Sequence, residues 1–282
     1  MIHTASLKAS LPMYDWPELS SQTDQLWQLI ADVIADVIAK DISEHDLQPP
    51  EHLDRTSTMW ESWMSPDCVF SQTCGWPYAE SVYQHANLLV TPVYAAEGCK
   101  GMLNSSRIVC RSDDKRQSLA DFYQSTVVIN GEDSQSGYHA MRSALVADNL
   151  PAPFFAQQLI SGAHRESIKR VAEGDADIAA IDPVSWTLSK RFETQVTDNL
   201  RVLAQCPYTP GLPYIVSKSL LGEPGLQQLT VKLQTLLQNL PKALANDLMI
   251  SDAIPVDASD YELFNQRNQQ ANQAGHTHLC RA

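Results

Sequence analysis

The chain has 282 residues, of which 44% are hydrophobic and 19% charged, with 11 glycines and 16 prolines. This composition is typical of a globular protein and excludes a disordered or collagen-like chain, while the length fits about two domains. The formal charge of −13 with neutral histidine would repel a phosphate backbone, so we do not expect nucleic acid as a partner.

The first strong pattern along the chain is helical. Between residues 21 and 40 apolar side chains recur every three or four positions, after a start that resembles a capping box. The most apolar part, 26–39, contains two aspartates and is shorter than the roughly 20 residues that span a bilayer. We therefore expect an amphipathic helix here and no membrane-spanning segment.

Short apolar or β-branched runs follow, and helical patterns lie between several of them. The expected strands are 68–71, 87–91, 107–111, 126–130, 177–181, 200–204 and 214–217, and the expected helices 136–147, 164–173, 183–191 and 226–240. Strands that alternate with helices indicate an α/β fold with parallel or mixed sheets. Gly and Pro at 211–213, and the segment 104–106, are candidate places for the chain to cross between two lobes.

The segment 126–141 is the most informative for function, because a buried-type strand leads into a Ser/Gly-rich turn and then a helix. Free amides at a helix N-terminus favour an anion, and the hydroxyls of Ser134 and Ser136 add donors. The alternative interpretation is that one of these serines only caps the helix.

Two further polar residues are expected at the carboxyl edge of the same sheet, where open α/β folds bind ligands. His164 lies in the turn before the helix 164–173, and Asp182 follows the strand 177–181 directly. Each has a simpler alternative. His164 could be an ordinary capping or surface histidine, and Asp182, which precedes a proline, could be an ordinary helix N-cap.

Two strand-end loops are candidates for the rest of a ligand site. The loop within 69–78 carries Gln72, Thr73 and Tyr78, and the loop near the N-terminus carries Tyr14. Core packing explains the aromatic residues of both loops equally well.

Motifs for catalysis, metals and cofactors are absent from the sequence. No Gly-x-Ser-x-Gly elbow, His-Glu-x-x-His helix, Walker loop or Gly-x-Gly-x-x-Gly fingerprint occurs, and no base can be paired with Cys74. The six cysteines are scattered without a Cys-x-x-Cys pair, and the tail with His276, His278 and Cys280 has no second cluster. We therefore expect free thiols, no cofactor, no metal site and no enzymatic activity.

Taken together, six segments resemble one family, although no single piece is specific. They are 6–15, 70–77, 91–94, 130–137, 161–164 and 176–182. Their combined spacing resembles the phosphate and phosphonate substrate-binding proteins of ABC transporters, the PhnD-like group, over about residues 5–220.

The resemblance implies a type 2 periplasmic binding protein fold, with two α/β lobes joined by two crossover strands and a ligand cleft between them. Lobe 1 is then expected at 1–105 and 212–282, and lobe 2 at 106–211. The family's serine-rich helix start corresponds to 134–137, that is Ser134, Gln135, Ser136 and Gly137, with Gln135 replacing a small hydroxyl residue. Its histidine, acidic residue and lobe-one tyrosine correspond to His164, Asp182 and Tyr78.

By this resemblance the chain is expected to bind a small anion, most simply a phosphonate, phosphate or phosphate ester, and to have an ABC permease as a partner. The N-terminus lacks a basic region followed by an apolar core. We therefore expect a cytoplasmic location for the chain as written, and a periplasmic one if a leader has been removed. A cytoplasmic ligand sensor and an enzyme built on the same fold are the alternatives.

Overall fold

The computed structural model describes residues 7–41 and 47–281. The chain divides into two compact units: unit 1 comprises residues up to 95 and 211–261, and unit 2 comprises 96–210 and the residues from 262 onward. This division differs from the expected lobes mainly at 96–105 and after residue 261, both of which belong to unit 2. The chain therefore passes between the units three times.

Unit 1 is built on a four-stranded sheet in the order β1-β2-β13-β3, and β4 and β14 form a separate antiparallel pair. The strands are β1 (Lys8–Ser10), β2 (Cys68–Gln72), β3 (Ala86–Leu88), β4 (Val90–Tyr94), β13 (Tyr214–Ser217) and β14 (Ile250–Pro255). β1 is parallel to β2, whereas β13 is antiparallel to both of its neighbours.

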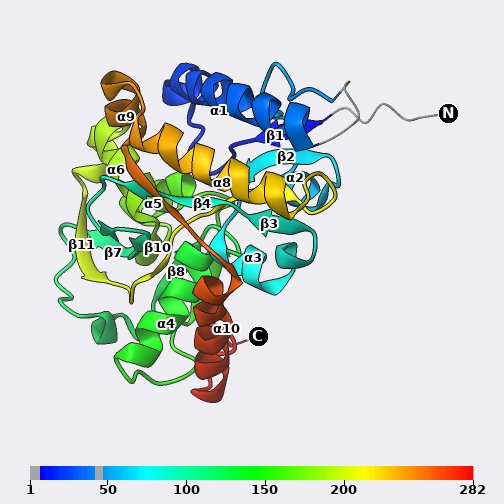
Figure 1. The fold of residues 1–282 in the computed structure, drawn as a ribbon. Helices are drawn as coiled ribbons and strands as arrows, with labels where there is room; N and C mark the ends of the chain where they lie inside the picture. Colours follow the sequence, from blue (N-terminus) through cyan, green and yellow to red (C-terminus); the bar gives the residue numbers. More distant parts are fainter. Residues whose placement is uncertain (1–6, 42–46, 282) are drawn as a thin grey trace. The chain divides into compact units, whose positions relative to one another are not determined.

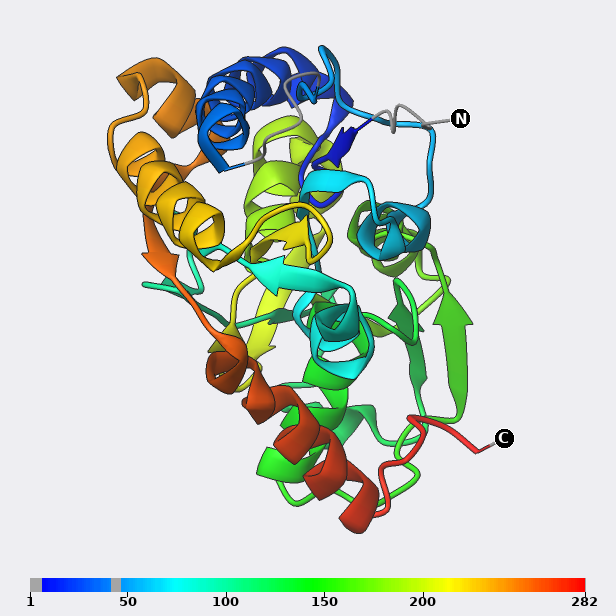
Figure 2. The same cartoon turned by 45° about the vertical axis from the view of Figure 1, so that its right-hand side comes forward.

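The longer helices of unit 1 are α1 (Ser20–Asp41) and α8 (Glu223–Gln238), which lie against each other (Figures 1 and 2). The shorter ones are η1 (Pro17–Leu19), α2 (Met59–Met64), α3 (Gly75–Glu80), η2 (Val82–Gln84) and α9 (Lys242–Leu248). Aromatic side chains connect α1 to the sheet: the ring centroids of Trp27 and Phe70 are 6.1 Å apart, and those of Phe70 and Tyr214 4.7 Å apart.

Unit 2 contains a five-stranded sheet in the order β11-β7-β10-β8-β9 and a small sheet β12-β6-β5. Its strands are β5 (Cys99–Lys100), β6 (Leu103–Asn104), β7 (Arg107–Arg111), β8 (Thr126–Ile129), β9 (Gln157–Ile160), β10 (Ile178–Ile181), β11 (Leu200–Gln205) and β12 (Thr209–Pro210). β10, β8 and β9 are mutually parallel, and β7 is antiparallel to β10 and β11.

The helices of unit 2 follow its strands in the chain. They are η3 (Leu119–Phe122), the π-helical turn η4 (Gln135–His139), α4 (Ala140–Ala147), α5 (His164–Glu173), α6 (Pro183–Phe192) and α7 (Thr194–Thr197). A last helix, α10 (Ala258–Gln273), begins in unit 1 and continues into unit 2. No helix of the described ranges is long and apolar enough to cross a bilayer.

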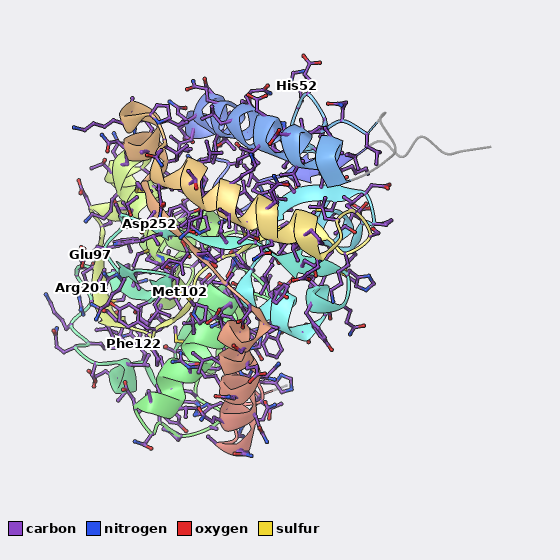
Figure 3. All side chains as sticks on the ribbon, in the orientation of Figure 1. His52, Glu97, Met102, Phe122, Arg201 and Asp252 are labelled. Carbon is purple, nitrogen blue, oxygen red and sulfur yellow. The ribbon has the colours of Figure 1, made fainter. Side chains whose placement is uncertain are left out.

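Both faces of the five-stranded sheet are covered. Alternate residues of β10 belong to two different cores: Ile178 and Ala180 pack with side chains of α4, and Ala179 and Ile181 with side chains of α5 and α6. Phe122, which is labelled in Figure 3, is fully buried in the first of these cores. α4 and α5 therefore lie on opposite faces of the sheet, although both follow parallel strands.

The main expected elements are present. β7 and α5 have the expected bounds, and the helix expected at 136–147 is η4 continued by α4. The strand expected at 87–91 is divided between β3 and β4. The segment after β2, expected to be a loop, is instead the short helix α3, in which Trp76 and Tyr78 are buried.

Candidate functional site

The carboxyl edge of the parallel strands in unit 2 is where the candidate residues gather. β8 leads into η4 and α4, β9 into α5, and β10 into α6. Because α4 and α5 cover opposite faces of the sheet, their N-termini flank the end of β8, which lies between β10 and β9. In open α/β sheets such a change of side leaves a crevice that binds ligands.

The first of these helix starts is held by Ser134. Its hydroxyl oxygen accepts a 3.0 Å hydrogen bond from the amide of Gly137, and its carbonyl accepts from the amides of Tyr138 and His139. A Cβ on Gly137 would lie 2.0 Å from Oδ1 of Asn130, so a larger residue at this position would require the Asn130 side chain to move. Ser134 is thus an N-cap, as the simpler alternative predicted, and it keeps a hydroxyl proton that it can donate.

The second helix start, that of α5, has no side-chain cap. Its N-cap residue is Ala163, and the backbone amides of His164 and Glu166 have no hydrogen-bond partner within residues 7–41 and 47–281. Uncapped amides and the positive end of the helix dipole favour an anion at this position.

A hydrogen bond joins the two helix starts. Oγ of Ser136 and Nε2 of His164 are 2.8 Å apart, which brings together two residues that the sequence placed at separate strand ends. Burial lowers the pKa of His164 to about 4, so the imidazole is neutral at pH 7. Its Nδ1 is buried and has no hydrogen-bond partner in the described parts of the chain.

The third helix start is already occupied. Asp182 is 2% exposed, and its Oδ1 accepts a 2.9 Å hydrogen bond from the amide of Ser185 in the first turn of α6. The N-cap alternative for Asp182 is therefore what the structure shows, and a ligand contact of this carboxylate stays a prediction.

Gln135 lies next to both serines but is itself buried, at 6% exposure. Together with His139, Arg142, Phe264 and Arg267 it lines a narrow cavity between the η4–α4 segment and α10. The Gln135 side chain thus faces the residues of α4 and α10 that pack behind η4. A contact of Gln135 with a ligand also stays a prediction.

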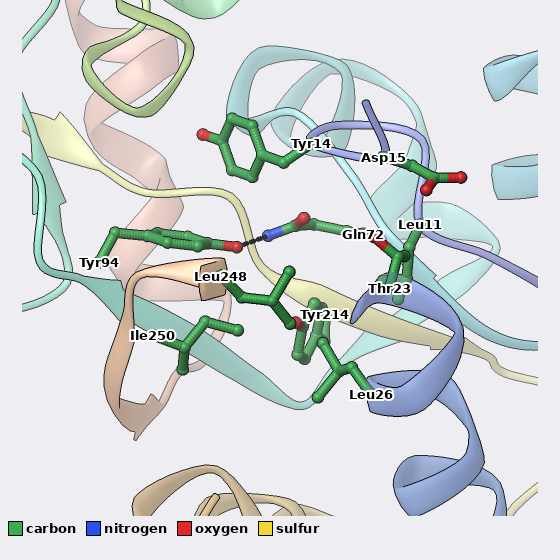
Figure 4. Close-up of a pocket in the computed structure, with 10 residues that line it drawn as sticks. All are labelled: Leu11, Tyr14, Asp15, Thr23, Leu26, Gln72, Tyr94, Tyr214, Leu248 and Ile250. Atoms are coloured by element: carbon green, nitrogen blue, oxygen red, sulfur yellow. Dashed lines mark hydrogen bonds between the residues drawn. The ribbon is translucent and has the colours of Figure 1, made fainter. Parts of the chain in front are cut away.

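In unit 1 the structure brings two of the predicted residues together. Tyr14 and Gln72 line one pocket with Tyr94 and Tyr214, and its volume of about 30 Å³ has room for about one water molecule (Figure 4). Nε2 of Gln72 donates to the hydroxyl of Tyr94 and to the carbonyl of Leu212, each at 3.1 Å. Tyr14 and Tyr94 stack edge to face, with ring centroids 5.1 Å apart.

The other two candidates of unit 1 do not line that pocket. Thr73 is fully buried, and its hydroxyl donates to the carbonyl of Cys74 at 3.2 Å. Tyr78 packs on Tyr261, with ring centroids 5.3 Å apart, and burial together with the charge of Asp257 raises the pKa of Tyr78 to about 12. Both residues are core residues, and core packing was the alternative given for Tyr78.

Three residues near the candidate groups were not predicted as site residues: Asn130, Tyr94 and Tyr214. Asn130 follows β8 and packs on Gly137, which the string Asn130–Gly137 could have suggested. Tyr94 ends β4 and Tyr214 begins β13, and a buried tyrosine gives no sequence signal for the pocket it lines.

The pair of Ser136 and His164 also bears on catalysis. Their separation of 2.8 Å is within the range for a serine and its general base, a pairing that the sequence did not indicate. A catalytic base, however, needs an acceptor on its other ring nitrogen, and Nδ1 of His164 has none among the described residues. Within the same residues no group of three or more His, Cys, Asp or Glu side chains is placed to hold a metal ion.

Comparison with known proteins identifies the family and the fold. The family model described as "ABC transporter, phosphonate, periplasmic substrate-binding protein" matches residues 45–261. No curated protein gives a significant match to the chain.

Solved structures with the same fold are distant in sequence. A binding protein component of an ABC phosphonate transporter from Pseudomonas aeruginosa is 15% identical, with a TM-score of 0.71, over 95% of this chain and 87% of that one. PhnD1 from Prochlorococcus marinus, solved in complex with methylphosphonate, is 14% identical, with a TM-score of 0.71, over 95% and 98%. XAC2383 from Xanthomonas citri, solved bound to ATP, is 15% identical, with a TM-score of 0.68, over 95% and 98%.

The fold is that of the two-lobed periplasmic binding proteins, as the resemblance implied. The chain belongs to the family of phosphonate substrate-binding proteins of ABC transporters, since the family model covers most of its length. It is thus a solute-binding protein and not an enzyme, and the family has an ABC permease as its partner.

Proposed function

We propose that unit 2 binds the oxyanion group of a small phosphonate, phosphate or phosphate ester between the starts of η4 and α5. The observation that carries this proposal is the hydrogen bond between Ser136 and His164, which joins a capped helix start to an uncapped one. The hydroxyls of Ser134 and Ser136 and the free amides of α5 are the donors that would contact the anion.

The strength of such a site is sufficient for a transport protein. Hydrogen bonds to a charged group contribute about 1.5 to 3 kcal/mol each. Three or four of them would give roughly 5 to 12 kcal/mol before ordering costs, against about 8 kcal/mol for micromolar binding. The net charge of −13 does not oppose this, because distant charges are screened beyond about 8 to 10 Å.

In unit 1, Tyr14, Gln72, Thr73 and Tyr78 remain predicted ligand contacts. We favour Tyr14 and Gln72 over the other two, because they line a pocket whereas Thr73 and Tyr78 are packed in the core. The exposed atoms of such a pocket would contact the organic part of the ligand.

Native mass spectrometry of the freshly purified protein, followed by a thermal-shift panel on unliganded protein, tests the proposal. The panel should contain methylphosphonate, inorganic phosphate, a phosphate monoester, sulfate and acetate. We expect one or more phosphorus oxyanions to raise the melting temperature, and acetate to have no effect. If the unliganded protein is not stabilised by any phosphorus oxyanion, the proposed ligand class is wrong.

We also propose that the protein works outside the cytoplasmic membrane, where an importer collects its substrate, and that it recognises no nucleic acid. The family description supports the location and the charge of −13 supports the second point. Cell fractionation of the producing organism, with the protein detected by antibody, tests the location: recovery only in the cytosol would overturn it.

A further inference from the structure

We propose that unit 1 has a ligand site of its own, which binds a small uncharged molecule with an apolar body and a hydroxyl or amide group. The site is a cavity between the end of α8, the helix α9 and the start of β14, three elements that follow one another in the chain (Figure 1). All residues that line it belong to unit 1, so this proposal does not depend on the anion site proposed for unit 2.

The size of the cavity suits a small organic molecule. Its volume is about 270 Å³, compared with about 30 Å³ for the pocket that Tyr14 and Gln72 line. An apolar cavity of about 150 Å³ can hold a benzene molecule. The cavity at α9 therefore has room for a molecule of about ten non-hydrogen atoms.

The most buried residues of the lining are apolar. They are Leu237 at the end of α8, Leu240 in the following turn and Ile250 at the start of β14. An apolar group placed against these side chains is removed from water, which is the main driving force for binding in such cavities.

The polar residues of the lining are Gln238, Asn246 and Ser251, and all three are exposed. Nε2 of Gln238 donates to Oδ1 of Asp252 at 2.9 Å. Oγ of Ser251 donates to the carbonyl of Val93 at 3.1 Å. The side-chain oxygens of Gln238 and Ser251 can still accept, and the amide of Asn246, which has no side-chain hydrogen bond to the described residues, can donate and accept.

Charge decides the class of ligand. None of the described residues that line the cavity is ionisable. A charged ligand would therefore lose hydration without gaining an opposite charge. An uncharged ligand with a hydroxyl or amide group loses less hydration, and its polar group can bond to the exposed amides and hydroxyl of the lining.

Met249 gives an independent indication that the cavity holds a ligand. It ends α9 in the left-handed conformation, with φ of 56°, which glycine or asparagine usually adopts at the end of a helix. The backbone alone thus disfavours methionine at this position. Met249 is half-buried and lines the cavity, and a flexible, polarisable thioether there can adapt to a bound molecule.

The first test uses benzyl alcohol as the probe and the full chain with carbon-13 in its methionine methyl groups, in the absence of phosphorus oxyanions. The Met249 signal is assigned by comparison with Met249→Leu. We expect benzyl alcohol to shift this signal saturably, with half-saturation on the order of millimolar, and to give intermolecular NOEs to the Met249 methyl group. Benzoate, which has a similar size and a negative charge, should bind at least about tenfold more weakly. A shift that does not saturate, or equal affinity for benzoate, would overturn the proposal.

The second test compares two substitutions on α9. Ala245 lines the cavity, and leucine there would fill part of its volume, whereas Ala243 is exposed and does not line it. We expect Ala245→Leu to bind benzyl alcohol at least about tenfold more weakly than the wild type, and Ala243→Leu to bind within about twofold. Equal affinity of the two folded variants would contradict the location. If Ala245→Leu does not fold, the NOEs to Met249 in the wild type decide it: their absence would overturn the proposal. A failure of the anion site in unit 2 would leave these results unchanged.

Discussion

The carboxylate of Asp182 accepts a 2.9 Å hydrogen bond from the amide of Ser185, so the start of α6 already holds a negative group of the chain's own. The neighbouring start of α5 follows Ala163, which has no side-chain oxygen to offer. α5 follows β9 and α6 follows β10, and both strands are parallel strands of one sheet. α6 nevertheless has a side-chain cap, whereas α5 has none. This difference is the reason that we place the proposed anion at α5 rather than at α6.

Replacement of Asp182 by asparagine therefore distinguishes between two roles of this side chain, an N-cap of α6 and a ligand contact. Asparagine keeps a cap oxygen, so we expect a loss of no more than about 1 kcal/mol in the free energy of unfolding. Removing a nearby negative charge should leave the affinity for methylphosphonate unchanged or raise it by about threefold at most. Chemical denaturation and titration calorimetry measure the two effects. An affinity lowered more than about tenfold would show that Asp182 contacts the ligand.

The substitution Gly137→Ala tests how tightly the start of η4 is packed. Alanine there would place its Cβ 2.0 Å from Oδ1 of Asn130, so we expect a loss of about 1 to 3 kcal/mol in the free energy of unfolding. Gly131→Ala is the comparison, since its Cβ would approach Oδ1 of Asp133 less closely, at 2.7 Å. Equal stability of the two variants, measured by thermal denaturation, would show that the turn is not packed as described.

The two serines should differ in what they stabilise. Ser134 caps the amide of Gly137, so Ser134→Ala should lower the free energy of unfolding by about 1 kcal/mol. Among the described residues the side chain of Ser136 bonds only to that of His164, and Ser136→Ala should change the free energy of unfolding by less than about 0.5 kcal/mol. Urea denaturation of both variants checks this order, and the reverse order would refute the assignment of the cap.

Much of unit 2 could be predicted from the sequence, because its elements have strong local signals. The apolar period of α5 and the buried run of β8 identified both elements, and the capping alternatives for Ser134 and Asp182 were visible in the residue types. The approach of Ser136 to His164 could not be predicted, because it depends on α4 and α5 covering opposite faces of the sheet.

α10 illustrates why other parts were missed. Its sequence is rich in Asn and Gln and has few apolar positions, so no amphipathic pattern marks it as a helix. The structure holds its second half through Arg142, which is 3% exposed and donates to Oδ1 of Asn268 at 2.7 Å and of Asn272 at 2.6 Å. Hydrogen bonds from a distant guanidinium give no local signal for a helix, and α10 belongs to unit 2 from residue 262 onward.

Three histidines, of which His139 and His276 are buried and His164 is half-buried, give the protein a characteristic pH dependence. Burial lowers the pKa of His139 to about 3 and that of His164 to about 4, and it also lowers the pKa of His276. Below about pH 6.5 the unfolded chain binds protons that the folded protein does not. The free energy of unfolding should therefore be highest above this pH and fall on acidification, by up to about 1.4 kcal/mol per pH unit for each histidine.

Urea denaturation between about pH 7 and pH 5 isolates this effect, because carboxylates titrate mainly below about pH 4. His139→Gln should make the curve less steep, whereas substitution of the exposed His52 by glutamine should leave it unchanged (Figure 3). A wild-type stability that is constant over this interval would mean that the histidines are not buried in neutral form.

The central claim, that an oxyanion binds between the starts of η4 and α5, is tested most directly by titration calorimetry with methylphosphonate. Unliganded wild-type protein and Ser136→Ala should be compared at one pH and one salt concentration, after both are shown to be folded. The account predicts one saturable site in the wild type and at least about tenfold weaker binding in Ser136→Ala, the loss of one hydrogen bond to a charged group. Saturable binding of equal affinity in both proteins would contradict it.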